Sequence, residues 1–288
     1  MSLQFNEYYN EYTGLTVGIK QLLFSEQSDF QLVEVYETDT WGNLMVIDGM
    51  VMLSEMDEFV YHEMLTHVGL FSHPNPQKVL IIGGGDGGSA REVLKHKSVK
   101  SVDMVEIDET VVRAAKQFLP NVGDFDNPRL NVIYENGLTF VEQSENKYDV
   151  IIIDGSDPVG PAVDLFKNEF YMNCHRALTE KGVLTAQTES PWMSGYHKSI
   201  KNLFSALNEH FKESEMYLGF VPLYPTGMWS FAFASKYLHA QSPEVLEKVK
   251  TTLPLKPALR YYNQEIHRGS FALPAFVRDI LSSKNIKN

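Results

Sequence analysis

Hydrophobic residues in the first 56 positions come in short runs that partly alternate with polar residues. Such runs, rich in β-branched and aromatic side chains, predict strands, and Asp48-Gly49 between two of them is a strong signal for a two-residue hairpin. Trp41-Gly42-Asn43 marks a second turn. Residues 1–56 are therefore expected to form a small antiparallel β-domain, which packs on its neighbour or on a second subunit because so small a sheet is marginally stable alone. The expected strands are 15–19, 31–36, 44–47 and 50–52.

From Asp57 onwards the pattern changes to short apolar runs that alternate with segments of helical periodicity. Strands that alternate with helices predict an α/β fold with a parallel sheet, whose ligands bind beyond the carboxyl ends of the strands. Residues 57–288 are expected to form this second domain, which ends in a hairpin pair and, from Pro243, a helical and loop-like tail. The expected strands are 79–82, 101–107, 130–134, 148–153, 182–187, 218–221 and 229–234, and the expected helices are 57–71, 89–96, 109–118, 166–178 and 196–211.

The stretch Val79-Leu-Ile-Ile-Gly-Gly-Gly-Asp-Gly-Gly-Ser-Ala-Arg91 combines a buried strand, a glycine turn and the start of a helix. This order is typical of the mononucleotide-binding unit that begins a doubly wound sheet. Asp86 places a carboxylate in the turn, where the pyrophosphate of a dinucleotide would rest on bare backbone N–H groups. An anion at this point repels a diphosphate and attracts a cation. The sequence therefore favours a nucleoside that carries positive charge, such as an S-adenosyl sulfonium compound.

Polar residues follow the ends of the other predicted strands. Glu106 lies twenty residues after Asp86, which is the separation at which an acidic residue reaches ribose hydroxyls. The alternative for Glu106 is a solvated loop carboxylate, whereas Asp108 is expected to cap the helix that starts at Glu109. The remaining candidates at strand ends are Asn136-Gly137, residues 154–157 and Gln187.

The segment Ile151-Ile-Ile-Asp-Gly-Ser-Asp-Pro-Val-Gly-Pro161 brings two carboxylates, Asp154 and Asp157, to the edge of the predicted sheet. Carboxylates this close raise each other's pKa unless a cation lies between them. The prolines and the glycine that follow are expected to shape a loop able to cover a ligand. The alternative is purely structural, with Asp157 capping the next segment in an Asx-turn.

Charge and composition narrow the choice of partners. The net charge of −12 argues against nucleic acid and anionic membrane surfaces and favours small cationic ligands, with an ordinary acidic soluble protein as the alternative. The N-terminus lacks signal-peptide features, no apolar run approaches membrane-spanning length, and a single Cys174, expected in the core, indicates a reducing compartment. A cytoplasmic location is therefore expected. His62, His67 and His73 are not spaced as metal ligands, and no metal site is expected.

Several motifs occur together in the order known from one enzyme family. They are Tyr61-His-Glu63, Gly83-Gly-Gly-Asp-Gly-Gly88, Val105-Glu-Ile-Asp108 and Asp154-Gly-Ser-Asp-Pro-Val-Gly-Pro161, and the Asp48-Gly49 hairpin and Pro222-Leu-Tyr-Pro-Thr-Gly227 fit the same pattern. From about residue 4 to residue 235 the chain resembles the polyamine aminopropyltransferases, specifically spermidine synthases. The resemblance implies a small β-domain before a Rossmann-like, methyltransferase-type catalytic domain. The small size of the β-domain favours assembly as a homodimer or homotetramer.

The same resemblance implies an activity. Enzymes of this family transfer the aminopropyl group of decarboxylated S-adenosylmethionine to putrescine and release methylthioadenosine. Decarboxylated S-adenosylmethionine is then a co-substrate, and no cofactor is expected. The sequence does not separate putrescine from cadaverine or agmatine as the acceptor.

The resemblance also implies roles for individual residues. Asp154 is the expected proton acceptor, between the amine and the sulfonium. The expected diamine contacts are Tyr61, Asp157, Gln187 and Tyr224, and His62 and Asp86 are expected at the polyamine or aminopropyl end. The expected nucleoside contacts are Gln31, Gly83, Gly85, Glu106, Asn136, Gly137 and Pro161. Asn136 stands where the family generally has an acidic residue that accepts from the adenine amino group, and Gly155 stands where serine is usual. Both departures are expected to affect nucleoside affinity more than activity.

Three other interpretations stay open. A methyltransferase on the same fold would have to hold the methionine carboxylate, which Asp86 would repel. A nicotinamide-dependent dehydrogenase is disfavoured by the same acidic loop. A non-catalytic scaffold of the same family would be expected to lack Asp154 or Asp157, and both are present.

Overall fold

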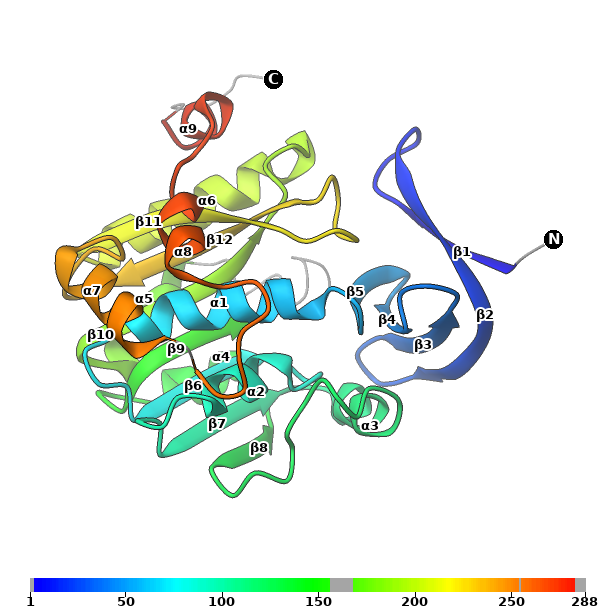
Figure 1. Cartoon of the computed structure of the whole chain (residues 1–288), viewed down its shortest axis with the longest axis horizontal. Coiled ribbons are helices and arrows are strands. Elements are labelled where there is room, and N and C mark those ends of the chain that lie inside the picture. Colours follow the sequence, from blue (N-terminus) through cyan, green and yellow to red (C-terminus); the bar gives the residue numbers. More distant parts are fainter. Residues whose placement is uncertain (1–2, 156–167, 254, 283–288) are drawn as a thin grey trace.

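The N-terminal part of the chain forms a five-stranded antiparallel sheet (Figure 1). The structure is a computed structural model that describes residues 3–155, 168–253 and 255–282. Asp48 and Gly49 have positive φ angles of 50° and 79° in the two-residue turn between the last two strands, which confirms the predicted hairpin. The strands, in sheet order, are β1 (Leu3–Tyr8), β2 (Gly14–Gln27), β3 (Leu32–Thr38), β4 (Asn43–Ile47) and β5 (Met50–Ser54).

A second sheet of seven strands forms the body of the molecule, in the order β11-β12-β10-β9-β6-β7-β8. The five strands from β8 to β10 run parallel, and β12 and β11 add an antiparallel hairpin at one edge. The arrangement confirms the predicted α/β class. The strands are β6 (Lys78–Gly83), β7 (Ser101–Glu106), β8 (Leu130–Tyr134), β9 (Tyr148–Asp154), β10 (Leu178–Glu189), β11 (Glu213–Phe220) and β12 (Met228–Ser235).

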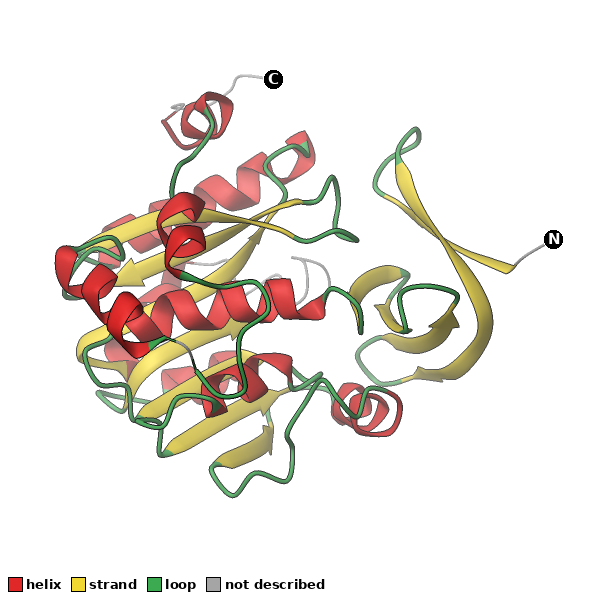
Figure 2. Ribbon diagram, viewed as in Figure 1, coloured by secondary structure: helices red, strands yellow, loops and turns green. Residues whose placement is uncertain are grey.

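Helices cover both faces of this sheet (Figure 2). Alternate residues of the central strands point to opposite faces, so Val79 and Ile81 join one buried cluster while Leu80 and Ile82 join another. Cys174 is fully buried in the second cluster, as predicted. The helices are α1 (Glu58–Ser72), α2 (Gly88–Leu94), α3 (Glu109–Phe118), α4 (Gly137–Glu142), α5 (Asn168–Ala177), the 3₁₀ turn η2 (Ser194–Tyr196), α6 (His197–His210), α7 (Pro243–Thr252), α8 (Gln264–Ser270) and α9 (Ala275–Ser282). Within the described ranges, no helix has the length and apolar composition needed to cross a membrane.

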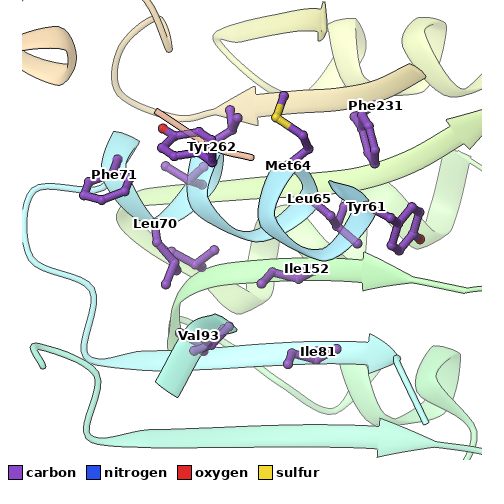
Figure 3. Close-up of a cluster of buried hydrophobic side chains, with 14 of the residues drawn as sticks. Tyr61, Met64, Leu65, Leu70, Phe71, Ile81, Val93, Ile152, Phe231 and Tyr262 are labelled. Atoms are coloured by element: carbon purple, nitrogen blue, oxygen red, sulfur yellow. The ribbon is translucent and has the colours of Figure 1, made fainter. Parts of the chain in front are cut away.

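Helix α1 is buried on nearly every side. In Figure 3, Ile152 of the sheet lies on one side of the helix and Tyr262 of the C-terminal segment lies on the other. The ring of Tyr262 stacks on Phe71 at the end of α1, with centroids 5.7 Å apart. The segment that covers this second side of the helix lies almost 200 residues further along the chain. The periodicity of α1 therefore carries no information about that contact.

Several elements differ from the predicted ones. The strand pattern predicts neither β1 nor the full length of β2, which spans fourteen residues with two register shifts against β3. The shifts interrupt the alternation of buried and exposed residues on which strand prediction depends. Strand β10 begins at Leu178 instead of Gly182 for the same reason, because its register to β9 shifts between Leu178 and Val183. Helix α4 has six residues, too few for a periodic signal.

The two sheets are joined through α3. Val33, Val35 and Met45 of the first sheet pack against Val111 and Leu119 in and after α3. Because α3 follows β7, this contact places the N-terminal sheet near the carboxyl end of the parallel strands. The first sheet ends at Ser54 and α1 begins at Glu58, so only three residues separate the two units.

Candidate active site

One cleft lies at the carboxyl ends of β6, β7 and β9 and faces the N-terminal sheet, which contributes Met45, Ile47 and Met52 to its wall. Counted out to open solvent, the space between the lining residues is about 1020 Å³. Most of the predicted site residues lie together here. These are Gln31, Tyr61, His62, Gly83, Gly85, Asp86, Glu106, Asn136, Gly137, Asp154 and Tyr224.

The glycine turn after β6 is a point of close approach between elements. Gly83 has a φ of 82°, and a Cβ atom there would lie 2.2 Å from the carbonyl oxygen of Asp154. A Cβ atom on Gly88 would lie 2.3 Å from the ring of His62. The side chain of Asp86 accepts a hydrogen bond from the Gly88 N–H at 2.7 Å. The absence of side chains therefore lets α1, β9 and the carboxylate of Asp86 meet at one end of the cleft.

Asp154 ends β9 and is almost fully buried. The Tyr61 hydroxyl donates to Asp154 Oδ1 at 2.7 Å, whereas Oδ2 has no hydrogen-bond partner among the described residues. Burial, and then the charge of Asp86, raise the pKa of Asp154 above its ordinary value. A buried carboxylate with one oxygen fixed by a hydroxyl group is suited to accept a proton from a ligand at its other oxygen.

His62 lies between two carboxylates. Its Nδ1 is 2.6 Å from Glu58 Oε2, and its Nε2 is 3.1 Å from Asp86 Oδ1. Burial alone would lower the pKa of His62, but the charge of Asp86 and the hydrogen bonds to both carboxylates outweigh it, and the pKa is raised well above its ordinary value. For Asp86 the balance is the opposite, since the charge of His62 overcomes burial and lowers the pKa. The neighbouring carboxyl groups of Asp86 and Asp154 therefore have pKa values shifted in opposite directions.

Glu106 ends β7 and is only 8% exposed. Its Oε1 accepts from the Asp108 N–H at 2.9 Å, and burial raises its pKa to about 7. The prediction that Asp108 caps α3 is confirmed, because its Oδ1 accepts from the Thr110 N–H at 2.9 Å. Gln31 Nε2 donates to Asp108 Oδ2 at 3.1 Å, so a residue of the N-terminal part is tied to the edge of the cleft.

Asn136 caps α4, with its Oδ1 accepting from the Leu138 N–H at 2.9 Å. A carbonyl oxygen has two lone pairs, so the cap leaves one acceptor position free for a ligand. Gly137 lies against Ile82, and a Cβ atom there would come within 2.5 Å of Ile82 Cγ2. This close packing keeps the start of α4 at the wall of the cleft.

A smaller cavity adjoins the main cleft and shares Met52, Tyr61, Gly155 and Tyr224 with it. Gln187 lies in this second cavity and is absent from the lining of the first. Its Nε2 donates to the Gly155 carbonyl oxygen at 3.1 Å, and its Oε1 has no partner within the described part of the chain. Aromatic rings form one wall, where Tyr224 contacts Tyr61 on one side and Trp229 on the other, with centroids 5.6 and 4.7 Å apart. The aromatic wall and the amide suit a slender polar ligand.

Comparison with known proteins agrees with this geometry. Residues 58–244 match the family model of the spermine/spermidine synthase domain, and residues 3–55 match that of the spermidine synthase tetramerisation domain. The chain is 45% identical over 287 residues to a polyamine aminopropyltransferase of Alkaliphilus metalliredigens, covering 99% of this chain and 100% of that one. The chain belongs to the spermine/spermidine synthase family. Polyamine aminopropyltransferase 1 of Bacillus cereus is also 45% identical, over 98% of this chain and all of its own length.

Solved structures of the family show the same fold. A crystal structure of spermidine synthase in complex with the transition-state analogue AdoDATO superposes with a TM-score of 0.91 at 43% identity, covering 97% of this chain and 94% of that one. The spermidine synthase of Thermotoga maritima gives a TM-score of 0.89 at 42% identity, with the same coverage. The predicted fold, a Rossmann-like domain preceded by a small antiparallel sheet, is thereby confirmed.

Two residues expected from the family pattern, Asp157 and Pro161, lie outside the described residues. Two other residues near the site, Glu58 and Arg91, are not predicted from the sequence. Glu58 is buried, Arg91 is half-buried, and the two side chains are hydrogen-bonded to each other beside His62. Glu58 lies four residues before His62, so helical spacing places it on the same face of α1 and could have revealed it. Arg91 carries no comparable signal, because a basic residue on a short helix usually faces solvent.

The cleft contains a group of side chains with several possible ligand atoms. Atoms of His62, Asp86 and Asp154 all lie within 4.8 Å of one another. Both ring nitrogens of His62 face carboxylate oxygens, so each carries a proton and offers no lone pair to a metal ion. The group is better suited to an organic cation. The expectations of no metal and no cofactor remain predictions.

Proposed function

We propose that this family member is a spermidine synthase, which transfers the aminopropyl group of decarboxylated S-adenosylmethionine to putrescine and releases methylthioadenosine. The observation that carries the proposal is the position of Asp154. This buried carboxylate, with one oxygen held by Tyr61, lies in the main cleft beside Gly155, which the adjoining cavity shares. The main cleft then holds the sulfonium nucleoside, and the second cavity holds the diamine.

The nucleophile has to lose a proton. A primary amine has a pKa of ~10.4, so presenting it uncharged at pH 7 costs about 4.6 kcal/mol. A sulfonium nearby lowers the pKa of the amine through repulsion of like charges, and Asp154, whose own pKa is raised, accepts the proton as the new bond forms. The amine nitrogen attacks the carbon next to sulfur, the C–S bond breaks, and its electron pair stays on sulfur as a neutral thioether.

Orientation supplies a further large part of the rate. Holding the two reactants in line lowers the activation free energy by ~7–11 kcal/mol. In this proposal Glu106 binds the ribose and Asp86 binds the amino end of the aminopropyl chain, and both residues line the main cleft. Tyr61, Tyr224 and Trp229 surround the second cavity, where aromatic faces attract the distal ammonium group of a diamine. Gln187 Oε1 can accept a hydrogen bond from the same ammonium.

Assembly and location complete the proposal. The match of residues 3–55 to a tetramerisation domain supports a homo-oligomer. Small cations are the proposed ligands, and the acidic net charge of −12 supports them over nucleic acid or membrane partners. Decarboxylated S-adenosylmethionine acts as a co-substrate with no further cofactor, in the cytoplasm.

An acceptor panel tests the function. The protein is incubated with decarboxylated S-adenosylmethionine and putrescine, cadaverine or agmatine, and released methylthioadenosine and the polyamine product are measured by chromatography. Putrescine is expected to give the highest kcat/KM and spermidine as product. Intact S-adenosylmethionine is tested in parallel, and methyl transfer from it, or no methylthioadenosine with any acceptor, would contradict the proposal.

Asp154→Asn tests the assigned proton acceptor. The amide keeps the shape but accepts no proton, so turnover is expected to fall by about 10²–10⁴-fold, while methylthioadenosine binding measured by calorimetry stays close to wild type. Asp149→Asn is the matched control, since Asp149 lies on the same strand but at its other end, where it accepts from the Gln77 and Lys78 N–H groups. Near-normal turnover of Asp154→Asn would rule out the role.

A further inference from the structure

A row of alternating charges leads from helix α2 to the cleft. The Arg91 guanidinium donates to both oxygens of Glu58, through Nη1 and Nη2 at 2.9 Å each. Glu58 Oε2 is 2.6 Å from Nδ1 of His62, and Nε2 of His62 is 3.1 Å from Oδ1 of Asp86. The signs alternate from positive Arg91 to negative Asp86. Glu58 and His62, in the middle of the row, each have a partner of opposite charge on both sides.

The hydrogen bonds determine the charge of His62. A neutral imidazole has one nitrogen without a proton, and here that lone pair would point at a carboxylate oxygen. Both nitrogens have carboxylate partners, so the ring is an imidazolium. His62 and Glu58 are only 2% and 6% exposed, and a buried ion pair needs such well-formed partners to offset its desolvation.

Arg91 is held in place by more than Glu58. Its Nε donates to Glu92 Oε1 at 2.8 Å, and its Nη1 donates to the Val122 carbonyl oxygen at 2.8 Å. It is not among the residues that line the cleft, so it does not reach the ligand space itself. It is the fourth of the seven residues of α2, the helix that follows the glycine turn. The planar guanidinium group, which bonds Glu58 like a two-pronged fork, is therefore held in a fixed orientation outside the cleft.

We propose that Arg91 is a positioning residue for the aminopropyl transfer: its fork fixes Glu58, and through Glu58 and His62 it sets the orientation and the negative charge of Asp86. The inference rests on the proposed function. With Asp86 held as an ion pair, the neighbouring Asp154 is the carboxylate left to take the proton. The planar geometry of the guanidinium matters here, because lysine offers a point charge and cannot bond both oxygens of Glu58 in a plane.

A double-mutant cycle tests the path from Arg91 to the cleft. Arg91→Gln is expected to lower kcat by about tenfold, as for members of one hydrogen-bonded network, with a smaller change in KM. In a His62→Gln background the same substitution is expected to have little further effect, because the path is already broken. An equal fall in both backgrounds would overturn the proposal, since Arg91 would then act without His62.

The pH profile of kcat gives a second readout that loss of stability alone would not move. The groups that face Asp154 are Tyr61, Asp86 and His62, and those that face Asp86 are His62, Asp154 and, at longer range, Arg91. Removing the positive charge of Arg91 makes the cluster more negative, so the acid limb of the profile is expected to move to higher pH in Arg91→Gln. Arg91→Lys keeps the charge and is expected to restore the limb while kcat stays reduced. An unchanged acid limb in Arg91→Gln would count against the proposal.

Arg129→Gln is the matched control. Arg129 is a half-buried arginine of the same domain that donates to the carbonyl oxygens of Leu94, His96 and Val99, away from the cleft. The control is expected to lower the unfolding midpoint and to leave kcat and its pH profile unchanged. A fall in kcat equal to that of Arg91→Gln would mean that both act through stability, which would overturn the proposal.

A readout without substrates separates this inference from the proposed function. Proton NMR of ¹⁵N-histidine-labelled protein reports the ring N–H groups of His62. Both are expected in the wild type and in Arg129→Gln, and the Nδ1–H signal is expected to broaden in Arg91→Gln because Glu58 is no longer fixed. If the wild type transferred no aminopropyl group but showed this pattern, the proposed function would fail and the link from Arg91 to Asp86 would stand. Unchanged signals in Arg91→Gln would refute the link whatever the activity.

Discussion

Burial of the Glu106 carboxyl group makes its ionisation sensitive to pH near neutrality. Its side chain is buried at the end of β7, and its pKa is raised to about 7 in the ligand-free protein. A ribose hydroxyl donates its hydrogen bond most strongly to the ionised carboxylate. A nucleoside therefore binds the deprotonated form better, and protonation of Glu106 competes with binding below about pH 7.

The affinity for methylthioadenosine is expected to fall as the pH falls. With a pKa near 7 and one competing proton, the dissociation constant should rise ~20-fold between pH 7.5 and pH 5.5, as measured by calorimetry at the two pH values. Glu106→Gln is expected to bind weakly and with no pH dependence over this range. Glu109→Gln, an exposed neighbour at the start of α3, should behave as wild type. A flat profile for the wild type would show that Glu106 does not carry the interaction.

Residues at strand ends could be predicted from the sequence, whereas the contacts between distant segments that hold them in place could not. Glu106 and Asp154 each follow an apolar run, and parallel strands bring such positions to one edge of a sheet. Arg91 reaches Glu58, 33 residues away, through the packing of α2 on α1. No local pattern encodes that contact. The same holds for the aromatic wall, because Tyr224 meets Tyr61 only once the hairpin of β11 and β12 has joined the sheet.

At the scale of elements, helix α1 connects the cleft with the C-terminal segment. Glu63, the residue after His62, accepts hydrogen bonds from the backbone N–H groups of residues 260–262 at 2.7–2.8 Å. The carboxylate thus fixes a loop that has no regular structure of its own. The motif Tyr61-His-Glu63 therefore combines two residues that line the cleft with one that holds the C-terminal segment in place.

Replacing Glu63 with alanine is expected to destabilise the protein. Three backbone N–H groups lose a charged acceptor, and the expected loss in the free energy of unfolding is about 3 kcal/mol, measured by urea denaturation. Glu265→Ala, at an exposed position of α8, is the control and should change the free energy by less than about 0.5 kcal/mol. If the two variants unfolded at the same urea concentration, the carboxylate would not be holding the segment.

The same helix explains what periodicity can and cannot predict. The sequence predicts α1, α3 and α6 within two residues, because each is long enough for capping residues and apolar spacing to agree. It does not show that nearly every side of α1 is buried, because Tyr262 and its neighbours cover the helix from a tail with weak patterns of its own. Packing between distant segments decides burial, and a single window of sequence does not contain both partners.

At the scale of the whole molecule, the N-terminal sheet is unusual for its exposed edge. Strand β1 pairs only with β2, and the two strands extend away from the body of the molecule (Figure 1). Several large apolar side chains along them face solvent, including Tyr8 at 77% and Leu22 at 50% exposure. An open edge with apolar side chains favours association with another chain. These observations agree with the match of residues 3–55 to a tetramerisation domain.

The protein is therefore expected to be a homotetramer with four times the chain mass of 32.8 kDa, measured by light scattering after gel filtration. Burial of a leucine side chain contributes about 1.5–3 kcal/mol, so Leu22→Glu, which removes that burial and adds a charge in every subunit, should shift the assembly to smaller species at micromolar concentration. Met172→Glu, on α5 and also exposed, is the control that should leave the mass unchanged. Because the N-terminal sheet also forms a wall of the cleft through Met45, Ile47 and Met52, loss of assembly is expected to raise KM for the nucleoside. A Leu22→Glu variant that stayed tetrameric at all concentrations would place the subunit contacts elsewhere on the molecule.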